Sequence, residues 1–110
     1  MKEKIIPILN DEYKVIVCWG TDKLIEKIAK NWGYENFVVD KTPRRGRTYY
    51  HPNCHPIIHL PHKPKTPAEI GTLAHEAVHA VTNIFEKIDE TESGEVFAHS
   101  VGAVVRAILK

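Results

Sequence analysis

The sequence predicts one α+β domain, in which a small mixed or antiparallel sheet packs against separate helices. Short runs rich in β-branched and aromatic residues, bounded by turn residues, occupy much of the first 61 positions. Two longer segments in the second half carry apolar residues at helical spacing. The chain has 110 residues, of which 43% are hydrophobic, and this is enough for one modest core. We therefore expect a single domain over residues 1–110.

The first expected elements are a strand and a helix. Tyr13–Trp19 is β-branched and aromatic, which predicts a strand. Thr21 or Asp22 can cap a helix that runs to about Trp32, and Gly33 is a typical stop.

Three short strands are expected next. Phe37–Val39 begins one of them, and a basic loop with proline and glycine, Lys41–Arg47, separates it from a returning strand at Thr48–Tyr50. Pro56–Pro61 is a short apolar strand with proline at both ends. Because proline cannot donate to a ladder, we expect the central part of this strand, Ile57–Leu60, at the edge of the sheet.

Two helices complete the expected fold. Thr66–Glu69 contains an N-cap threonine, a proline at the first helical position and the glutamate of a capping box, so a helix begins there and continues to roughly Lys87. An acidic, turn-like stretch follows. A last apolar helix then runs from Glu92 or Ser93 to Lys110.

The first of these helices carries the pattern His75-Glu76-x-x-His79, which is typical of zinc hydrolases. Residues four apart share one face of a helix, so both imidazoles can reach one ion. Glu76 then lies beside the open coordination position, where it can take a proton from water. A shuffled chain of this composition contains the pattern with a probability of roughly 0.03, so its surroundings must support the prediction.

A catalytic zinc usually has three protein ligands, and the last helix offers candidates for the third. At 100° per residue, one face of that helix combines two possible ligands with small residues that would allow close approach to the motif helix. This face carries Glu95, Ala98, His99, Gly102 and Arg106.

The helical spacing alone does not decide between Glu95 and His99. We favour Glu95 because it lies at the start of the helix, near the turn that returns the chain to the motif. Glu92 and Glu90 are further alternatives. If Glu95 is the ligand, His99 would either orient Glu95 from the second shell of the metal or donate a hydrogen bond to the oxyanion. Tyr49 and Tyr50 are also candidates for the oxyanion donor.

Together, His75-Glu76-x-x-His79, the acidic linker and Glu95-x-x-Ala98 at the start of an apolar helix resemble the minimal zincin-like domains of gluzincin type. Such domains occur among small phage and prophage metallopeptidases, with a more distant similarity to ImmA/IrrE-like peptidases. The resemblance covers roughly residues 37–109. It implies one zinc ion on His75, His79 and Glu95, with Glu76 as the general base that attacks a peptide bond. It also implies that a peptide or protein substrate adds as a strand along Ile57–Leu60.

A second group of possible ligands lies upstream of the motif. It combines several histidines with one cysteine, and these are His51, Cys54, His55, His59 and His62. Their spacing matches no closed zinc pattern, so we expect mostly surface or strand residues. His59 is the member that we expect to be nearest to the active-site cleft.

Charge and composition narrow the partners. The formal net charge of +1 gives no general case for nucleic acid, and no apolar run is long enough for a signal peptide or a membrane helix. Two cysteines make no disulfide framework, so we expect a cytoplasmic setting, the host cytoplasm if the protein is phage-encoded. Two alternatives to an enzyme are a non-catalytic zinc-binding phage module and an accessory protein that binds DNA or protein through the basic loop.

Overall fold

The computed structural model describes residues 2–9, 11–88 and 94–110. Within these ranges the chain forms four strands and three helices, which confirms the predicted α+β class. In chain order the elements are β1 (Glu3–Ile8), β2 (Tyr13–Trp19), α1 (Asp22–Asn31), β3 (Arg47–Tyr49), β4 (Ile57–Leu60), α2 (Pro67–Lys87) and α3 (Gly94–Leu109).

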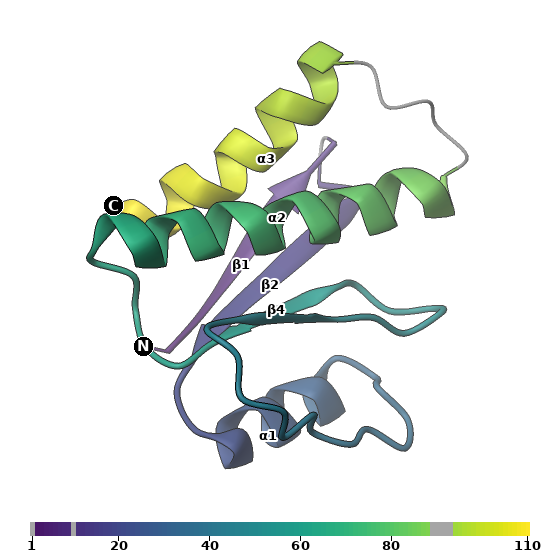
Figure 1. Cartoon of the computed structure of the whole chain (residues 1–110). Helices are drawn as coiled ribbons and strands as arrows, with labels where there is room; N and C mark the ends of the chain where they lie inside the picture. Colours follow the sequence, from purple (N-terminus) through teal and green to yellow (C-terminus); the bar gives the residue numbers. More distant parts are fainter. Residues whose placement is uncertain (1, 10, 89–93) are drawn as a thin grey trace.

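The strands of the described chain form one mixed sheet in the order β1-β2-β4-β3. β1 pairs with β2 and β3 pairs with β4 in antiparallel fashion, whereas β2 and β4 are parallel. Figure 1 shows α2 and α3 together on one face of this sheet and α1 on the other. The sheet therefore lies between two helical layers, one formed by α2 and α3 and the other by α1.

The alternation of side chains along the two central strands builds a core on each face. On β2, Val15 and Val17 pack with α2 and α3, while Ile16 and Cys18 pack with α1. All four side chains are completely buried. A strand that is apolar on both faces is typical of the middle of a sheet covered by helices on both sides.

The prediction that Ile57–Leu60 is an edge strand is wrong. β4 lies between β2 and β3, and Ile57, Ile58 and Leu60 are buried. The two flanking prolines lie outside the paired residues, so they do not interrupt either ladder. The edge strand beside the motif helix is instead β3.

Two further differences concern the first half of the chain. β1 was not predicted, because Pro7 breaks the strand pattern of its sequence. The sheet tolerates this proline because β1 is an edge strand, at the end of the sheet opposite β3. Phe37–Val39 is not a strand, and Val38 is 81% exposed. Phe37 and Val39 nevertheless pack with α1 and the sheet as irregular chain.

The start of α2 agrees with the sequence prediction. The hydroxyl of Thr66 accepts a hydrogen bond from the Glu69 amide, and the Glu69 carboxylate accepts from the Thr66 amide. Pro67 occupies the first helical position, where its missing N–H costs no bond. α2 therefore begins and ends where the sequence places it.

α3 packs in antiparallel fashion on α2 through Phe97, Val104 and Ile108, and the rings of Phe97 and Phe85 meet edge to face with centroids 5.6 Å apart. The predicted start of this helix at Glu92 or Ser93 lies outside the described residues. In the part of the chain that the structure describes, we find no helix long and apolar enough to cross a membrane.

Candidate metal centre on the second helix

His75 and His79 come together on the exposed side of α2. Their Nε2 atoms are 3.1 Å apart, and the two rings are nearly perpendicular at 84°. Both side chains are open to solvent. The spacing predicted from the helical repeat therefore brings the two ring nitrogens to one point.

This separation fits two ligands of one zinc ion. Two nitrogens bound to a tetrahedral zinc at about 2.0–2.1 Å lie about 3.3–3.4 Å from each other. The Nε2 atoms of His75 and His79 need to move apart by only a few tenths of an ångström to reach that value. The rings also point outward, where an ion can enter from water.

Glu76 occupies a different environment from the two histidines. It is only 9% exposed, and its carboxylate accepts a hydrogen bond of 2.7 Å from the hydroxyl of Thr48 on β3. A buried carboxylate is costly unless it is hydrogen-bonded, so this contact holds the group in one place. The proposed base is thus positioned by the edge strand.

Gly46 allows the edge strand to come this close. A Cβ atom at Gly46 would meet Thr72 Cγ2 at 2.9 Å and Leu60 Cδ2 at 3.0 Å, and would lie 3.5 Å from Glu76 Cγ. The backbone before β3 therefore rests directly on α2 because this residue has no side chain.

Tyr50 lies on the same side of the sheet as Glu76, because it is two residues from Thr48 along the extended chain. Partial burial of the phenol, and next the charge of Glu76, raise the pKa of Tyr50 to about 12. The phenol is therefore a proton donor at neutral pH. Tyr49 points to the opposite face, where its ring meets Phe37 edge to face and its hydroxyl accepts from the Asp40 amide.

A hollow of about 450 Å³ opens beside His75 and Glu76. Its other walls come from the segment before β3 and from the first turns of α2, including Arg44, Arg45 and Ala68. We call this space the motif hollow. The sequence places these arginines in a basic loop, and the structure brings both of them to the wall of this hollow.

Glu95 and His99 lie elsewhere. Both line a hollow of about 400 Å³ together with Pro7, Ile8 and Leu9 at the end of β1. Their helix packs through the opposite side, so the face that we expected against α2 is exposed at Glu95 and His99.

The two small residues of that face do not contact α2 as we expected. Ala98 is exposed, and the three atoms nearest to a Cβ at Gly102 would all belong to the guanidinium of Arg106 on the same helix. Hence they do not create a close approach to α2.

Within the described ranges, no three His, Cys, Asp or Glu side chains converge closely enough to hold a metal ion. The alternative ligands Glu90 and Glu92 fall outside those ranges. The structure thus brings the rings of His75 and His79 together and places Glu76 with His75 at the motif hollow, whereas Glu95 and His99 line a different hollow.

The other histidines have separate contacts. His51 Nδ1 lies 3.3 Å from the thiol of Cys54, and His55 Nδ1 accepts from the Lys14 amide. His59 bonds the carbonyl of Gly20 through Nε2 at 2.9 Å, in a hollow on the α1 side of the sheet. His59 therefore does not line the motif hollow, in contrast to the expectation from sequence.

Sequence reasoning missed three contributors to the site, namely Thr48, Gly46 and Arg45. The alternation of the predicted strand Thr48–Tyr50 could have placed its first and last residues on one face. Nothing in the sequence indicates that this face meets Glu76, because that depends on which strand lies next to α2.

Comparison of the chain with models of protein families, with curated proteins and with solved structures found no match.

Proposed function

We propose that this protein is a zinc-dependent hydrolase of the metallopeptidase type, with His75 and His79 as metal ligands and Glu76 as the general base. The observation that carries the proposal is the Nε2–Nε2 separation of 3.1 Å beside a carboxylate fixed by Thr48. The resemblance to small gluzincin-type domains agrees with it.

Bound zinc would supply Lewis acidity that polarises a carbonyl group and makes water more acidic. Glu76 accepts one proton from the attacking water while the oxygen of that water bonds to the carbonyl carbon. The same proton is then passed to the leaving nitrogen as the C–N bond breaks, so the products are a carboxylic acid and an amine. Tyr50 is the better-placed oxyanion donor, because Tyr49 and His99 face other surroundings.

We retain Glu95 as the third ligand. Zinc binding would then bring the first turn of α3 from the hollow beside β1 to the histidine pair. Gly94, Glu95 and Val96 are exposed, so little packing opposes such a movement before Phe97. Glu95→Ala should weaken zinc binding at least tenfold, measured by competition with a chromophoric chelator. An unchanged affinity would remove Glu95 and make Glu90 and Glu92 the next variants to test.

The substrate peptide is proposed to lie along β3 rather than along β4. β3 ends the sheet, and Thr48 at its centre contacts Glu76. A peptide that adds to this edge as a further strand would pass beside the proposed base.

Hydrolysis by the zinc-loaded protein tests the function. Glu76→Gln should keep the zinc and lower kcat at least 100-fold, because a general base contributes about 10²–10⁴ to the rate. Glu26→Gln on α1 is the matched control, since Glu26 is exposed, lies on the other face of the sheet and does not line the motif hollow. Full activity in Glu76→Gln would contradict the assignment.

A second candidate function is a non-catalytic zinc-binding module on the same scaffold. It is favoured by the fact that, in the part of the chain described, only two imidazoles converge. This candidate predicts bound zinc, no hydrolysis of any peptide, and a biological activity that survives Glu76→Gln.

A further inference from the structure

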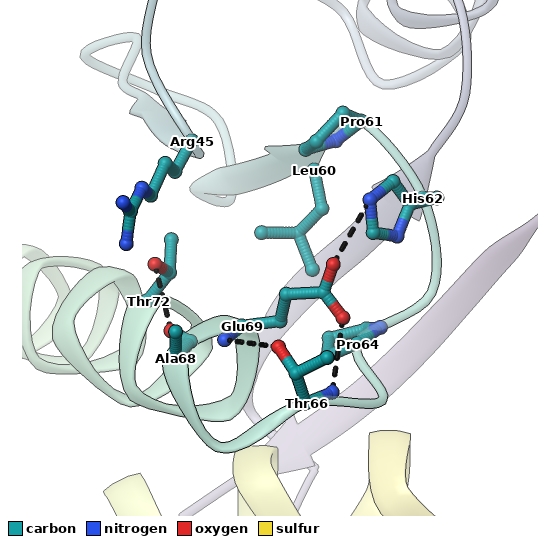
Figure 2. A pocket seen from close by; sticks show the side chains of 9 residues that line it. All are labelled: Arg45, Leu60, Pro61, His62, Pro64, Thr66, Ala68, Glu69 and Thr72. Carbon is teal, nitrogen blue, oxygen red and sulfur yellow. Dashed lines mark hydrogen bonds and ion pairs between the residues drawn. The ribbon is translucent and has the colours of Figure 1, made fainter.

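We infer that the pocket in Figure 2 is a substrate subsite that accepts a large apolar side chain, and that Arg45 at its mouth binds a carboxylate of the same peptide. This inference rests on the proposed function, because the pocket adjoins the motif hollow. It goes further by naming the chemistry of the substrate.

The pocket and the motif hollow form one continuous surface. The pocket has a volume of about 290 Å³ and lies between the end of β4 and the start of α2. Arg45, Ala68 and Thr72 line both spaces. A peptide that reaches Glu76 can therefore place a neighbouring side chain in the pocket without leaving the protein surface.

The size and walls of the pocket suit one apolar side chain. Leu60 projects into the pocket (Figure 2), and Pro61 and Pro64 add two apolar rings to its lining. Ala68 contributes only a methyl group, which leaves the entrance from α2 open. The volume is at the lower limit of about 300–1,000 Å³ for small-molecule sites, so it suits a leucine or phenylalanine side chain better than a larger ligand.

The charge at the mouth of the pocket is positive, although Glu69 also lines it. One Glu69 oxygen accepts from the Lys65 and Thr66 amides, and the other pairs with His62 at 3.0 Å. Glu69 is thus occupied by the helix cap and by His62 (Figure 2). Arg45 has no ion-pair partner among residues 2–9, 11–88 and 94–110.

A guanidinium group binds a carboxylate through two parallel hydrogen bonds, which makes Arg45 suited to that ligand. The carboxylate can come from the C-terminus of the peptide or from an Asp or Glu side chain. Arg45 lies at the junction of the two spaces, so in either case the charged group would flank the apolar side chain.

The experiment uses the zinc-loaded full chain and short quenched peptides. One position carries Leu, Phe, Ala or Lys, and each peptide is made with a free C-terminus, with an amidated C-terminus, or amidated with an internal Glu. We expect kcat/KM for Leu and Phe to exceed that for Ala at least tenfold, as apolar pockets discriminate by about that factor. A higher rate for the free acid alone would identify the C-terminus as the carboxylate, and a higher rate for the Glu peptide would identify a side chain.

Two pairs of variants locate the effect. Ala68→Phe should fill the pocket and abolish the preference for Leu over Ala, whereas Val38→Phe, at a position that is 81% exposed and lines neither space, should preserve it. Arg45→Gln should remove the preference for a carboxylate. Lys41→Gln should not, because Lys41 lines the hollow on the α1 side of the sheet.

Binding of the same peptides to zinc-loaded Glu76→Gln, measured by fluorescence anisotropy, distinguishes failure of the subsite from failure of the peptidase activity. Selective binding that Ala68→Phe abolishes, without hydrolysis by the wild type, would retain the subsite and reject the peptidase. Hydrolysis with an unaltered Leu preference in Ala68→Phe would reject the subsite and retain the peptidase. If there is neither hydrolysis nor selective binding, the subsite is rejected as well.

Discussion

At the scale of single residues, the main feature is the contrast between Glu76 and the two histidines beside it on α2. His75 and His79 are exposed and meet at 3.1 Å, whereas Glu76 is 9% exposed and bonded to Thr48. An exposed histidine pair can exchange a metal with solvent, while a buried carboxylate keeps one orientation. The sequence motif specifies the residue types, and the edge strand supplies the difference in environment.

Removal of the Thr48 hydroxyl should affect both stability and catalysis. Thr48→Val leaves the Glu76 carboxylate without its donor, which should lower the free energy of unfolding by about 1–3 kcal/mol. It should also lower kcat while zinc affinity stays within about threefold, because Thr48 touches Glu76 and not the histidines. Urea unfolding, peptide hydrolysis and zinc titration measure these quantities.

Thr48→Ser retains the hydroxyl and should restore most of the activity. Equal losses in the Val and Ser variants would show that the methyl group, and not the hydrogen bond, is important.

Gly46 can be compared with a second glycine that has free space around it. A Cβ at Gly46 would approach Thr72 to 2.9 Å, so Gly46→Ala should destabilise the protein by about 1–3 kcal/mol and displace β3 from Glu76. Gly71 on α2 has no atom within 4 Å of the added Cβ, and Gly71→Ala should stabilise the helix by about 0.5–1 kcal/mol. Chemical unfolding measures both. A neutral Gly46→Ala would refute the close contact.

At the scale of elements, α2 organises the site through its start. The Thr66 and Lys65 amides, which donate to Glu69, lower the pKa of that carboxyl group, and His62 lowers it further. α2 then presents its histidines toward solvent and its apolar stripe toward the sheet. The cap therefore fixes the first turns, which also form the walls of the motif hollow and the pocket.

The lowered pKa of Glu69 predicts a specific dependence of stability on pH. A carboxyl group with a folded-state pKa below its ordinary value of 4.5 stabilises the fold above that value. The stabilisation is lost as the pH falls through the lower, folded-state pKa. The difference in unfolding free energy between wild type and Glu69→Gln should thus be largest near pH 7 and should shrink below pH 4.5 in urea titrations. A difference that is constant with pH would contradict this role.

The elements that the sequence predicted well are those with local signals. α1, α2 and β2 follow from caps, glycine stops and β-branched runs, because these act within a few residues. The order of strands does not follow from such signals. β4 was expected at an edge because of its prolines, but its pairing with β2 and β3 depends on residues far away in the chain.

The candidate site divides in the same way. The placement of His75, Glu76 and His79 around α2 was predictable because one helix carries all three. Glu95 depended on how α3 is rotated on α2, and helical periodicity alone leaves that rotation open. The structure turns Phe97 and Val104 toward the core and Glu95 toward β1. The link between Glu76 and Thr48 joins residues 28 positions apart, which no local pattern indicates.

At the scale of the whole molecule, the sheet separates two regions with different roles. On the α2 side lie the histidine pair, the motif hollow and the pocket beside it, and the segment before β3 contributes Arg45 to both the hollow and the pocket. On the α1 side, Arg47 pairs with Asp40 at 2.6 Å and His59 bonds Gly20. The predicted chemistry is therefore confined to one face and one edge, where an extended peptide has room to bind.

The zinc content of the purified chain after dialysis shows whether His75 and His79 hold one zinc ion. We expect one zinc per chain in the wild type and in His62→Ala, because the imidazole of His62 is exposed and lies outside the pair. It predicts loss of the metal in His75→Ala and in His79→Ala, with folding verified by circular dichroism. Less than half an equivalent of zinc in the wild type, or full retention in either single variant, would contradict the claim.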